Sequence, residues 1–196
     1  DSGPLGALLE PFGELSFDAA YAGFSEIIEA GAEADLILIE TMSDLLEAKA
    51  ALLAAKEHSH LPVFVTMTFG ADGRTFLGVD PASAAVTLTS LGADAVGLNC
   101  SRGPQELRPV LGELLRATHL PVMIQPNAGL PRLENGETVY DVGPEAFAAC
   151  AAAFLDDGAA ILGGCCGTTP EHIRALRQLV GSRSYSPRRP DGRCRL

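Results

Sequence analysis

The chain has 196 residues, of which 47% are hydrophobic, and its formal net charge at pH 7 is −11. This length and apolar content suffice for one domain with a substantial core. The negative charge argues against nucleic acid or an anionic membrane as a partner, and without a long apolar run or a charged-then-apolar leader we expect neither membrane insertion nor export.

The chain opens with loop-forming residues, SGPLG at positions 2–6, and then turns to helical periodicity. The segment from Ser16 to Ala34 carries apolar residues at helical spacing, with Ser16 as its N-cap. The run DLILIET at 35–41 follows and is continuously apolar rather than alternating. Continuous apolar patterning predicts a strand buried on both faces, as in a parallel sheet.

The same alternation of strand and helix recurs along the chain. Strand starts are separated by about 26 to 38 residues, the size of a βα unit. The predicted strands are 35–41, 62–68, 95–100, 121–127 and 159–162, and the predicted helices are 16–34, 44–58, 81–91, 104–118, 144–155 and 170–180. Thr169 is the expected N-cap of the last helix, with Pro170 at its first position. We interpret residues 1–181 as one domain and the Arg- and Pro-rich residues 182–196 as a disordered tail.

Two architectures fit this alternation, a (β/α)8 barrel and a doubly wound open sheet. A barrel gathers the carboxyl ends of all its strands at one mouth, whereas an open sheet gathers only those at a switch point. Every predicted strand here ends in polar or thiol side chains, and the glycine-rich phosphate turn of doubly wound folds is absent. We therefore expect a TIM-type barrel, of which five strands and six helices are present. The strand-end residues are Glu40 and Thr41, Thr66 and Thr68, Asn99 and Cys100, Gln125 and Asn127, and Cys165 and Cys166.

Three of the five cysteines follow strands of this sheet. Cys100 ends one strand and Cys165-Cys166, set among glycines, follow another. With one strand between them these ends lie about 10 Å apart, a distance that a loop can close to the span of a tetrahedral zinc site with an open fourth position. The alternative is that these three cysteines are buried free thiols that act as small apolar side chains. For a fourth cysteine, Cys150, we prefer this interpretation. The cysteines are few for the length of the chain and odd in number, unlike the disulfide framework of a secreted protein, so we expect a cytosolic protein.

The motifs GCCGTTPEH at 164–172, GLNC at 97–100 and PNAGLP at 126–131 together resemble the homocysteine S-methyltransferase family. The likeness is greatest to the homocysteine-binding module of cobalamin-dependent methionine synthases. Supporting matches are SGPLG at 2–6, IETM at 39–42, EAK at 47–49 and GRTFLG at 73–78.

The resemblance implies a zinc-dependent methyl transfer to the thiol of L-homocysteine, giving methionine. It assigns Cys100, Cys165 and Cys166 as zinc ligands and Glu40 as the group that holds the homocysteine ammonium; a cap on the next helix is the alternative for Glu40. Asn99 and Asn127 are interpreted as orienting the substrate or the metal site, although Asn127 also fits a structural turn. The resemblance assigns no catalytic residue beyond the metal ligands. We expect the four histidines to be solvated rather than ligands.

The family barrel begins with strands that would precede Asp1. We therefore expect the chain to be part of a longer product or to be completed by another chain. Its methyl donor would be methylcobalamin, on a cobalamin domain of a multidomain protein that also carries a folate domain, or a small donor such as betaine or S-methylmethionine. The alternative function is a catalytically silent zinc-binding or interaction module whose sheet edge pairs with a partner.

Overall fold

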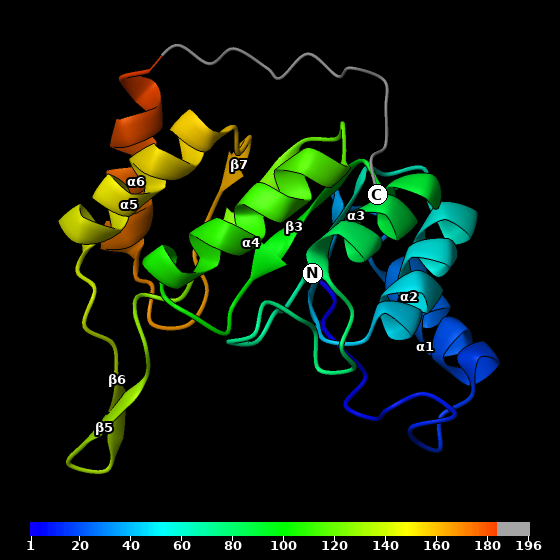
Figure 1. The fold of residues 1–196 in the computed structure, drawn as a ribbon. Coiled ribbons are helices and arrows are strands. Elements are labelled where there is room, and N and C mark those ends of the chain that lie inside the picture. Colours follow the sequence, from blue (N-terminus) through cyan, green and yellow to red (C-terminus); the bar gives the residue numbers. More distant parts are fainter. Residues whose placement is uncertain (184–196) are drawn as a thin grey trace.

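The computed structural model describes residues 1–183, which form one parallel sheet, a two-stranded hairpin and six helices (Figure 1). The strands of the sheet are β1 (Ile37–Met42), β2 (Val63–Met67), β3 (Ala95–Asn99), β4 (Val122–Gln125) and β7 (Ile161–Leu162). The helices are α1 (Phe17–Ala30), α2 (Leu45–His58), α3 (Pro81–Ser90), α4 (Pro104–Ala117), α5 (Pro144–Asp157) and α6 (Pro170–Gly181). None of these described helices is long and apolar enough to cross a membrane. The predicted disordered tail falls, from residue 184 on, outside the described residues.

The helices begin where the sequence places capping residues. Thr169 caps α6 with Pro170 at its first position, as predicted. The helix predicted over 16–34 is shorter than expected and ends at Ala30, because the Gly31 N–H bonds back to the last carbonyls of the helix and the chain turns. Side-chain caps begin three other helices: Ser16 at α1, Asp44 at α2 and Asp80 at α3.

The strands of the sheet lie in the order β1-β2-β3-β4-β7, and every neighbouring pair is parallel. A doubly wound sheet would reverse its order at a switch point, whereas a barrel adds its strands sequentially. The sequential order therefore confirms the predicted fold class, a partial TIM-type barrel. Within the described residues β1 and β7 form the two edges of the sheet and do not pair with each other.

The opening residues are tied to the sheet more firmly than a loop would be. Ser2 makes a parallel bridge to Ile39: the Ser2 N–H donates to the Leu38 carbonyl at 2.8 Å, and the Glu40 N–H donates to the Ser2 carbonyl at 2.9 Å. The segment before α1 therefore covers part of the outer edge of β1 through this single bridge.

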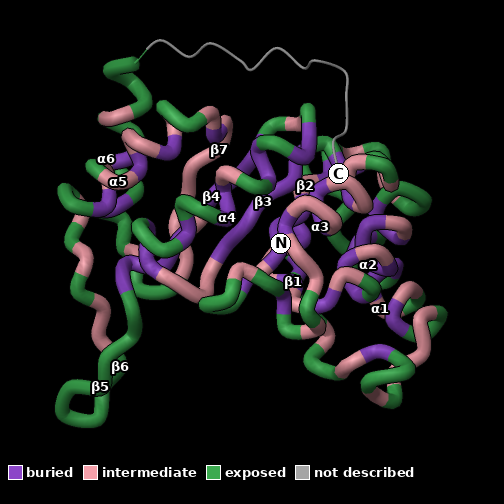
Figure 2. Tube along the Cα trace, viewed as in Figure 1, coloured by how far each residue is buried: buried purple, intermediate pink, exposed green. Residues whose placement is uncertain are grey.

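The two faces of the sheet have different roles, because successive side chains of a strand point to opposite faces. One face packs against the helices and forms the core, with Ile39, Val65, Leu98 and Ile124 fully or almost fully buried. Figure 2 shows this buried region running through the central strands. The opposite face carries the polar residues Glu40, Thr66, Asn99 and Gln125. The polar strand ends expected at the barrel mouth thus share the face that is turned away from the helices.

A hairpin between β4 and α5 was not expected from the sequence. It consists of β5 (Arg132–Glu134) and β6 (Glu137–Val139), and it extends from the body of the molecule with its tip exposed (Figures 1 and 2). Its turn is Asn135-Gly136, with both residues at positive φ, 52° and 85°. Asn-Gly is the strongest short-range hairpin signal, but the flanking residues lack the apolar run on which the predicted strands depended.

The prediction that all four histidines are solvated is wrong for His172, which is 5% exposed. Its Nδ1 accepts a hydrogen bond from the Thr169 N–H at 3.1 Å, so its Nε2 carries the proton that is donated to the Val142 carbonyl at 2.9 Å. The ring also meets Phe147 edge-on, with the ring centres 5.3 Å apart. His172 therefore joins the start of α6 to the chain that leads into α5.

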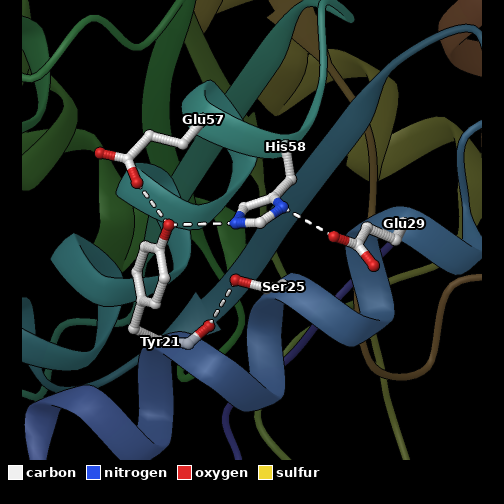
Figure 3. Close-up of polar contacts among 5 residues, drawn as sticks. All are labelled: Tyr21, Ser25, Glu29, Glu57 and His58. Atoms are coloured by element: carbon white, nitrogen blue, oxygen red, sulfur yellow. Dashed lines mark hydrogen bonds and ion pairs between the residues drawn. The ribbon is translucent and has the colours of Figure 1, made fainter.

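His58 is likewise engaged, at the surface between α1 and α2 (Figure 3). Its Nδ1 lies 2.7 Å from a Glu29 carboxylate oxygen and its Nε2 lies 3.1 Å from the Tyr21 hydroxyl. The Tyr21 hydroxyl also donates to Glu57, a bond that raises the pKa of Tyr21. These polar contacts join two helices far along the chain from the cysteine motifs.

We predict that His172→Ala lowers the free energy of unfolding by about 1–3 kcal/mol, because the Thr169 N–H and the Val142 carbonyl lose their buried partner. Urea denaturation followed by circular dichroism measures the change. His119→Ala, at an exposed position, is the matched control and should stay within about 0.5 kcal/mol of the parent. Equal stabilities of the two variants would contradict the structural role of His172.

Candidate functional site

The three predicted thiols meet at one point. Cys100 directly follows β3, and Cys165 and Cys166 follow β7, with β4 as the one strand between them. The Cys166 Sγ lies 3.7 Å from the Cys100 Sγ and 3.9 Å from the Cys165 Sγ, and all three sulfur atoms lie within 4.8 Å of one another. The predicted convergence of the thiols is therefore present in the structure.

The spacing of the sulfur atoms fits a tetrahedral metal ion. Two thiolates on one Zn²⁺, each at about 2.3 Å, are about 3.8 Å apart when the angle at the metal is tetrahedral. Within residues 1–183 no other group of three or more His, Cys, Asp or Glu side chains lies close enough to share a metal. The cluster thus offers three soft ligands and leaves the fourth corner to another donor.

The backbone turns sharply to present Cys100. Cys100 and Ser101 both have positive φ, 63° and 66°, a conformation that costs about 1–3 kcal/mol for each non-glycine residue. The surrounding chain holds it in place: the Cys100 N–H donates to the Gln125 carbonyl at 3.0 Å, and the Ser101 hydroxyl donates to the Phe69 carbonyl at 2.7 Å. Strain of this kind, held by neighbouring strands, is typical of functional sites.

The Cys165-Cys166 pair lies in a loop rather than in a strand, because β7 ends at Leu162. Both thiols can therefore point to one side, which successive residues of a regular strand cannot do. The Cys165 N–H donates to the Pro126 carbonyl at 2.9 Å. Glycine is required at position 164, since a Cβ there would lie 2.4 Å from the Thr168 side chain.

Asn99 links the ends of three strands to the thiols. Its Oδ1 accepts hydrogen bonds from the Thr41 N–H and the Thr66 hydroxyl, each at 2.8 Å. Its Nδ2 donates to the Thr41 hydroxyl at 2.7 Å and lies 3.8 Å from the Cys165 sulfur. Asn99 is 1% exposed and uses both ends of its amide. The structure thus places Asn99 in the frame of the thiol cluster, and its predicted contact with substrate stays a prediction.

Asn127 supports the same cluster from the loop after β4. Its Oδ1 accepts a hydrogen bond from the Cys166 N–H at 3.0 Å. Its side chain also hydrogen-bonds the Cys100 sulfur and so lowers the pKa of that thiol. Asn127 is 4% exposed, and its own N–H donates to the Arg102 carbonyl. The structure thus places Asn127 beside the thiols, and its predicted role in orienting the substrate or the metal site stays a prediction.

Glu40 lies in β1, on the face that also carries Asn99. The alternative role as a cap of the next helix is wrong, because Asp44 caps α2 through its own carboxylate. Within residues 1–183 the Glu40 side chain makes no hydrogen bond or ion pair. The half-buried carboxylate is therefore available to a cation, and its contact with a substrate ammonium stays a prediction.

The metal-free cluster concentrates negative charge on Cys100. A hydrogen bond from the Cys165 thiol is the largest of the effects that lower the pKa of Cys100 to about 5; burial opposes it, while the Ser101 N–H, the Cys166 thiol and Asn127 assist. The same hydrogen bond, followed by burial, raises the pKa of Cys165. At neutral pH the cluster therefore holds a thiolate at Cys100, the form of cysteine that binds metals.

Two further residues lie beside the cluster: Thr41, which sequence analysis named only as a strand-end residue, and Tyr140, which it did not identify. Thr41 has a positive φ of 62° at a bulge in β1, and it contacts Asn99 through its N–H and its hydroxyl. Tyr140 follows β6, and its ring lies against Gly167, the residue after the double cysteine. The Asn-Gly turn was the available signal for Tyr140, since it predicts a hairpin that returns the chain to the sheet.

Three comparisons with known proteins agree. A family model described as homocysteine S-methyltransferase matches residues 1–180. The chain is 40% identical to the methionine synthase of Mycobacterium leprae over 153 residues and 40% identical to that of Mycobacterium tuberculosis over 155 residues. These alignments cover 75% and 76% of this chain, but the chain spans only 13% of either relative.

Solved structures of the homocysteine methyltransferase MmuM from Escherichia coli share the fold. The apo form matches with a TM-score of 0.72 at 24% identity, over 90% of this chain and 61% of that chain. The metallated form matches with a TM-score of 0.67 at 23% identity, over 84% of this chain and 52% of that chain.

We predict that iodoacetamide alkylates Cys100 of the metal-free protein at pH 6 about tenfold faster than it alkylates an unperturbed thiol. The larger thiolate fraction outweighs the lower intrinsic nucleophilicity of a thiolate whose pKa is about 5. Because the pKa of the Cys100 thiol is lowered, its alkylation rate stays level as pH falls from neutral and declines only below about pH 5. Peptide mapping by mass spectrometry follows Cys100 alone.

Cys165→Ala removes the main hydrogen-bond donor to Cys100 and should move the inflection of this rate profile toward higher pH. Cys150→Ala, on α5, is the matched control and should leave the profile unchanged. An inflection above pH 8 in the parent protein would show that Cys100 is an ordinary thiol.

Proposed function

Because the chain belongs to the homocysteine S-methyltransferase family, we propose that it carries the zinc and homocysteine site of a methyltransferase that converts homocysteine into methionine. The observation that carries the proposal is the set of three thiols within 4.8 Å of one another, with two of the sulfur pairs at the spacing of a tetrahedral zinc site. The similarity to methionine synthases supports the same product. We further propose that residues 1–181 form one domain of this function, and that it works in the cytoplasm, where thiols stay reduced.

Cys100, Cys165 and Cys166 would hold the zinc ion, since three thiolates are ligands that zinc prefers. Bound there, zinc would supply an acidic site that keeps the incoming homocysteine thiol deprotonated at neutral pH. Three cysteine thiolates exceed the charge of a divalent cation by one. This surplus disfavours polarisation of a carbonyl and keeps a fourth sulfur electron-rich, which suits attack on a methyl group.

Asn99 and Asn127 would keep the three sulfur atoms in this arrangement while the fourth ligand changes. Asn99 holds the strand ends beside Cys165, and Asn127 holds the Cys166 backbone and the Cys100 thiol. Amide groups donate to sulfur without adding charge to the site. Their role would therefore be to orient the ligands, with the substrate contacts predicted for them still to be tested.

Glu40 would bind the ammonium group of homocysteine. Its carboxylate has no partner within residues 1–183 and lies on the sheet face that also bears Asn99. A charge-assisted hydrogen bond at this point would fix the orientation of the substrate relative to its thiol. Specificity for an amino thiol over a plain thiol would follow from this contact.

The reaction itself is a displacement at carbon. The homocysteine sulfur forms a bond to the methyl carbon, the bond between that carbon and the donor breaks, and its electron pair leaves with the donor; the proton of the thiol goes to solvent. We propose methylcobalamin on another domain or chain as donor, with cobalamin- and folate-binding domains as partners, because PNAGLP at 126–131 resembles the methionine synthase motif. Betaine or S-methylmethionine is the alternative donor.

We predict that protein purified under reducing conditions binds one zinc ion per chain and that Cys165→Ala abolishes this binding. Metal analysis measures the stoichiometry, and Cys150→Ala serves as the control that retains zinc. X-ray absorption at the zinc edge should show a fourth sulfur ligand once homocysteine is added. Reduced protein without zinc would contradict the proposed function, and zinc binding without a fourth sulfur would favour the silent metal-binding module.

We predict that Glu40→Gln weakens homocysteine binding about 10- to 100-fold and leaves the zinc content unchanged, because a charge-assisted hydrogen bond to the ammonium is lost. Calorimetric titration of the zinc-loaded protein measures the dissociation constant. The matched ligand is 4-mercaptobutanoate, which is homocysteine without its amino group. Its binding should be equally weak to the parent and the variant; a comparable loss for both ligands would assign Glu40 a structural role.

A further inference from the structure

Tyr140 lies at the foot of the β5–β6 hairpin, directly before the chain enters the segment that leads to α5. Its half-buried ring covers Gly167, which has a positive φ of 78° and follows the double cysteine. A Cβ on Gly167 would lie 2.3 Å from the Tyr140 ring. The aromatic side chain and the Cys166 loop are therefore built around each other.

The Tyr140 side chain, which lies against the residue after Cys166, interacts with the thiol cluster. Its pKa is raised by burial, then by the charge of Cys166 and by a hydrogen bond to the Cys166 side chain, and further by the charges of Cys100 and Cys165. A phenol is an O–H donor at neutral pH, and a thiolate is an acceptor. The contact between them is thus one in which Tyr140 donates and Cys166 accepts.

The bonds that hold the Cys166 loop also fix the position of Tyr140. The Ala128 N–H donates to the Cys166 carbonyl, and the Val142 N–H donates to the Ala128 carbonyl, each at 2.9 Å. The His172 Nε2 also donates a hydrogen bond to the Val142 carbonyl, which holds the chain two residues after Tyr140. The chain just after Tyr140 is therefore anchored to the loop that carries the thiol.

We propose that Tyr140 is a positioning residue for the metal ligands, which donates a hydrogen bond from its hydroxyl to the sulfur of Cys166. This inference rests on the proposed function, since it assigns Tyr140 a role toward the zinc thiolates. Three cysteine thiolates and a substrate thiolate give the centre a surplus of negative charge, and one O–H donor disperses part of that charge. Groups in this position typically change metal affinity 10- to 100-fold when they are removed.

The test compares Tyr140→Phe, which keeps the ring on Gly167 and removes only the hydroxyl, with the parent protein. We expect zinc affinity, measured by competition with a chromophoric chelator, to fall about tenfold. In the cobalt(II)-substituted protein the thiolate-to-metal charge-transfer band should shift, because the sulfur loses its hydrogen bond. Loss of packing alone would not move that band while three sulfur ligands are retained.

Tyr21→Phe is the matched control, since it removes a hydrogen-bonded tyrosine hydroxyl that contacts Glu57 and His58 instead of the thiols (Figure 3). It should leave both the zinc affinity and the cobalt band unchanged. Parent protein that binds zinc no more tightly than Tyr140→Phe, with the same band, would overturn the role of Tyr140 and leave the proposed function intact. Parent protein that binds no zinc would overturn both.

Discussion

Three sulfur atoms within 4.8 Å of one another set the constraint on which the local structure depends, because thiolates at this distance repel each other. The chain meets the constraint with backbone hydrogen bonds from the neighbouring strand. The N–H of Cys100 bonds to the end of β4, and the N–H of Cys165 bonds to the carbonyl directly beyond it. The intervening strand thus fixes both thiol-bearing segments, and a sheet with β3 and β7 on either side of β4 is the simplest frame that allows this.

The choice of asparagine at positions 99 and 127 follows from the same charge. Each amide accepts from backbone or hydroxyl groups at its oxygen, while its nitrogen is directed at a cysteine sulfur. A carboxylate at either position could accept the same hydrogen bonds, but it would add a negative charge beside thiolates and would have no proton to donate. Asparagine has the size of aspartate, but its amide can both accept the hydrogen bonds from backbone and hydroxyl groups and donate one to a cysteine sulfur.

Much of this arrangement could be predicted from the sequence. Continuous apolar runs located the strands of the parallel sheet, and the polar residues at their ends identified Cys100, Cys165 and Asn99 as neighbours. Features that depend on distant partners could not be predicted. His172 is buried because the Val142 carbonyl faces it, and Thr41 and Cys100 adopt positive φ because of bonds across the sheet. The hairpin carried its turn signal, but its short exposed strands lack any apolar pattern.

The position of Tyr140 has a practical consequence, because the chain contains no tryptophan and only three tyrosines. Near-ultraviolet absorption and intrinsic fluorescence therefore arise from very few chromophores. Of the two that the structure describes, Tyr21 contacts a carboxylate and an imidazole on α2, and Tyr140 contacts the thiol cluster. The ring beside Cys166 thus provides an intrinsic optical reporter, through which the state of the sulfur atoms can be followed in unlabelled protein.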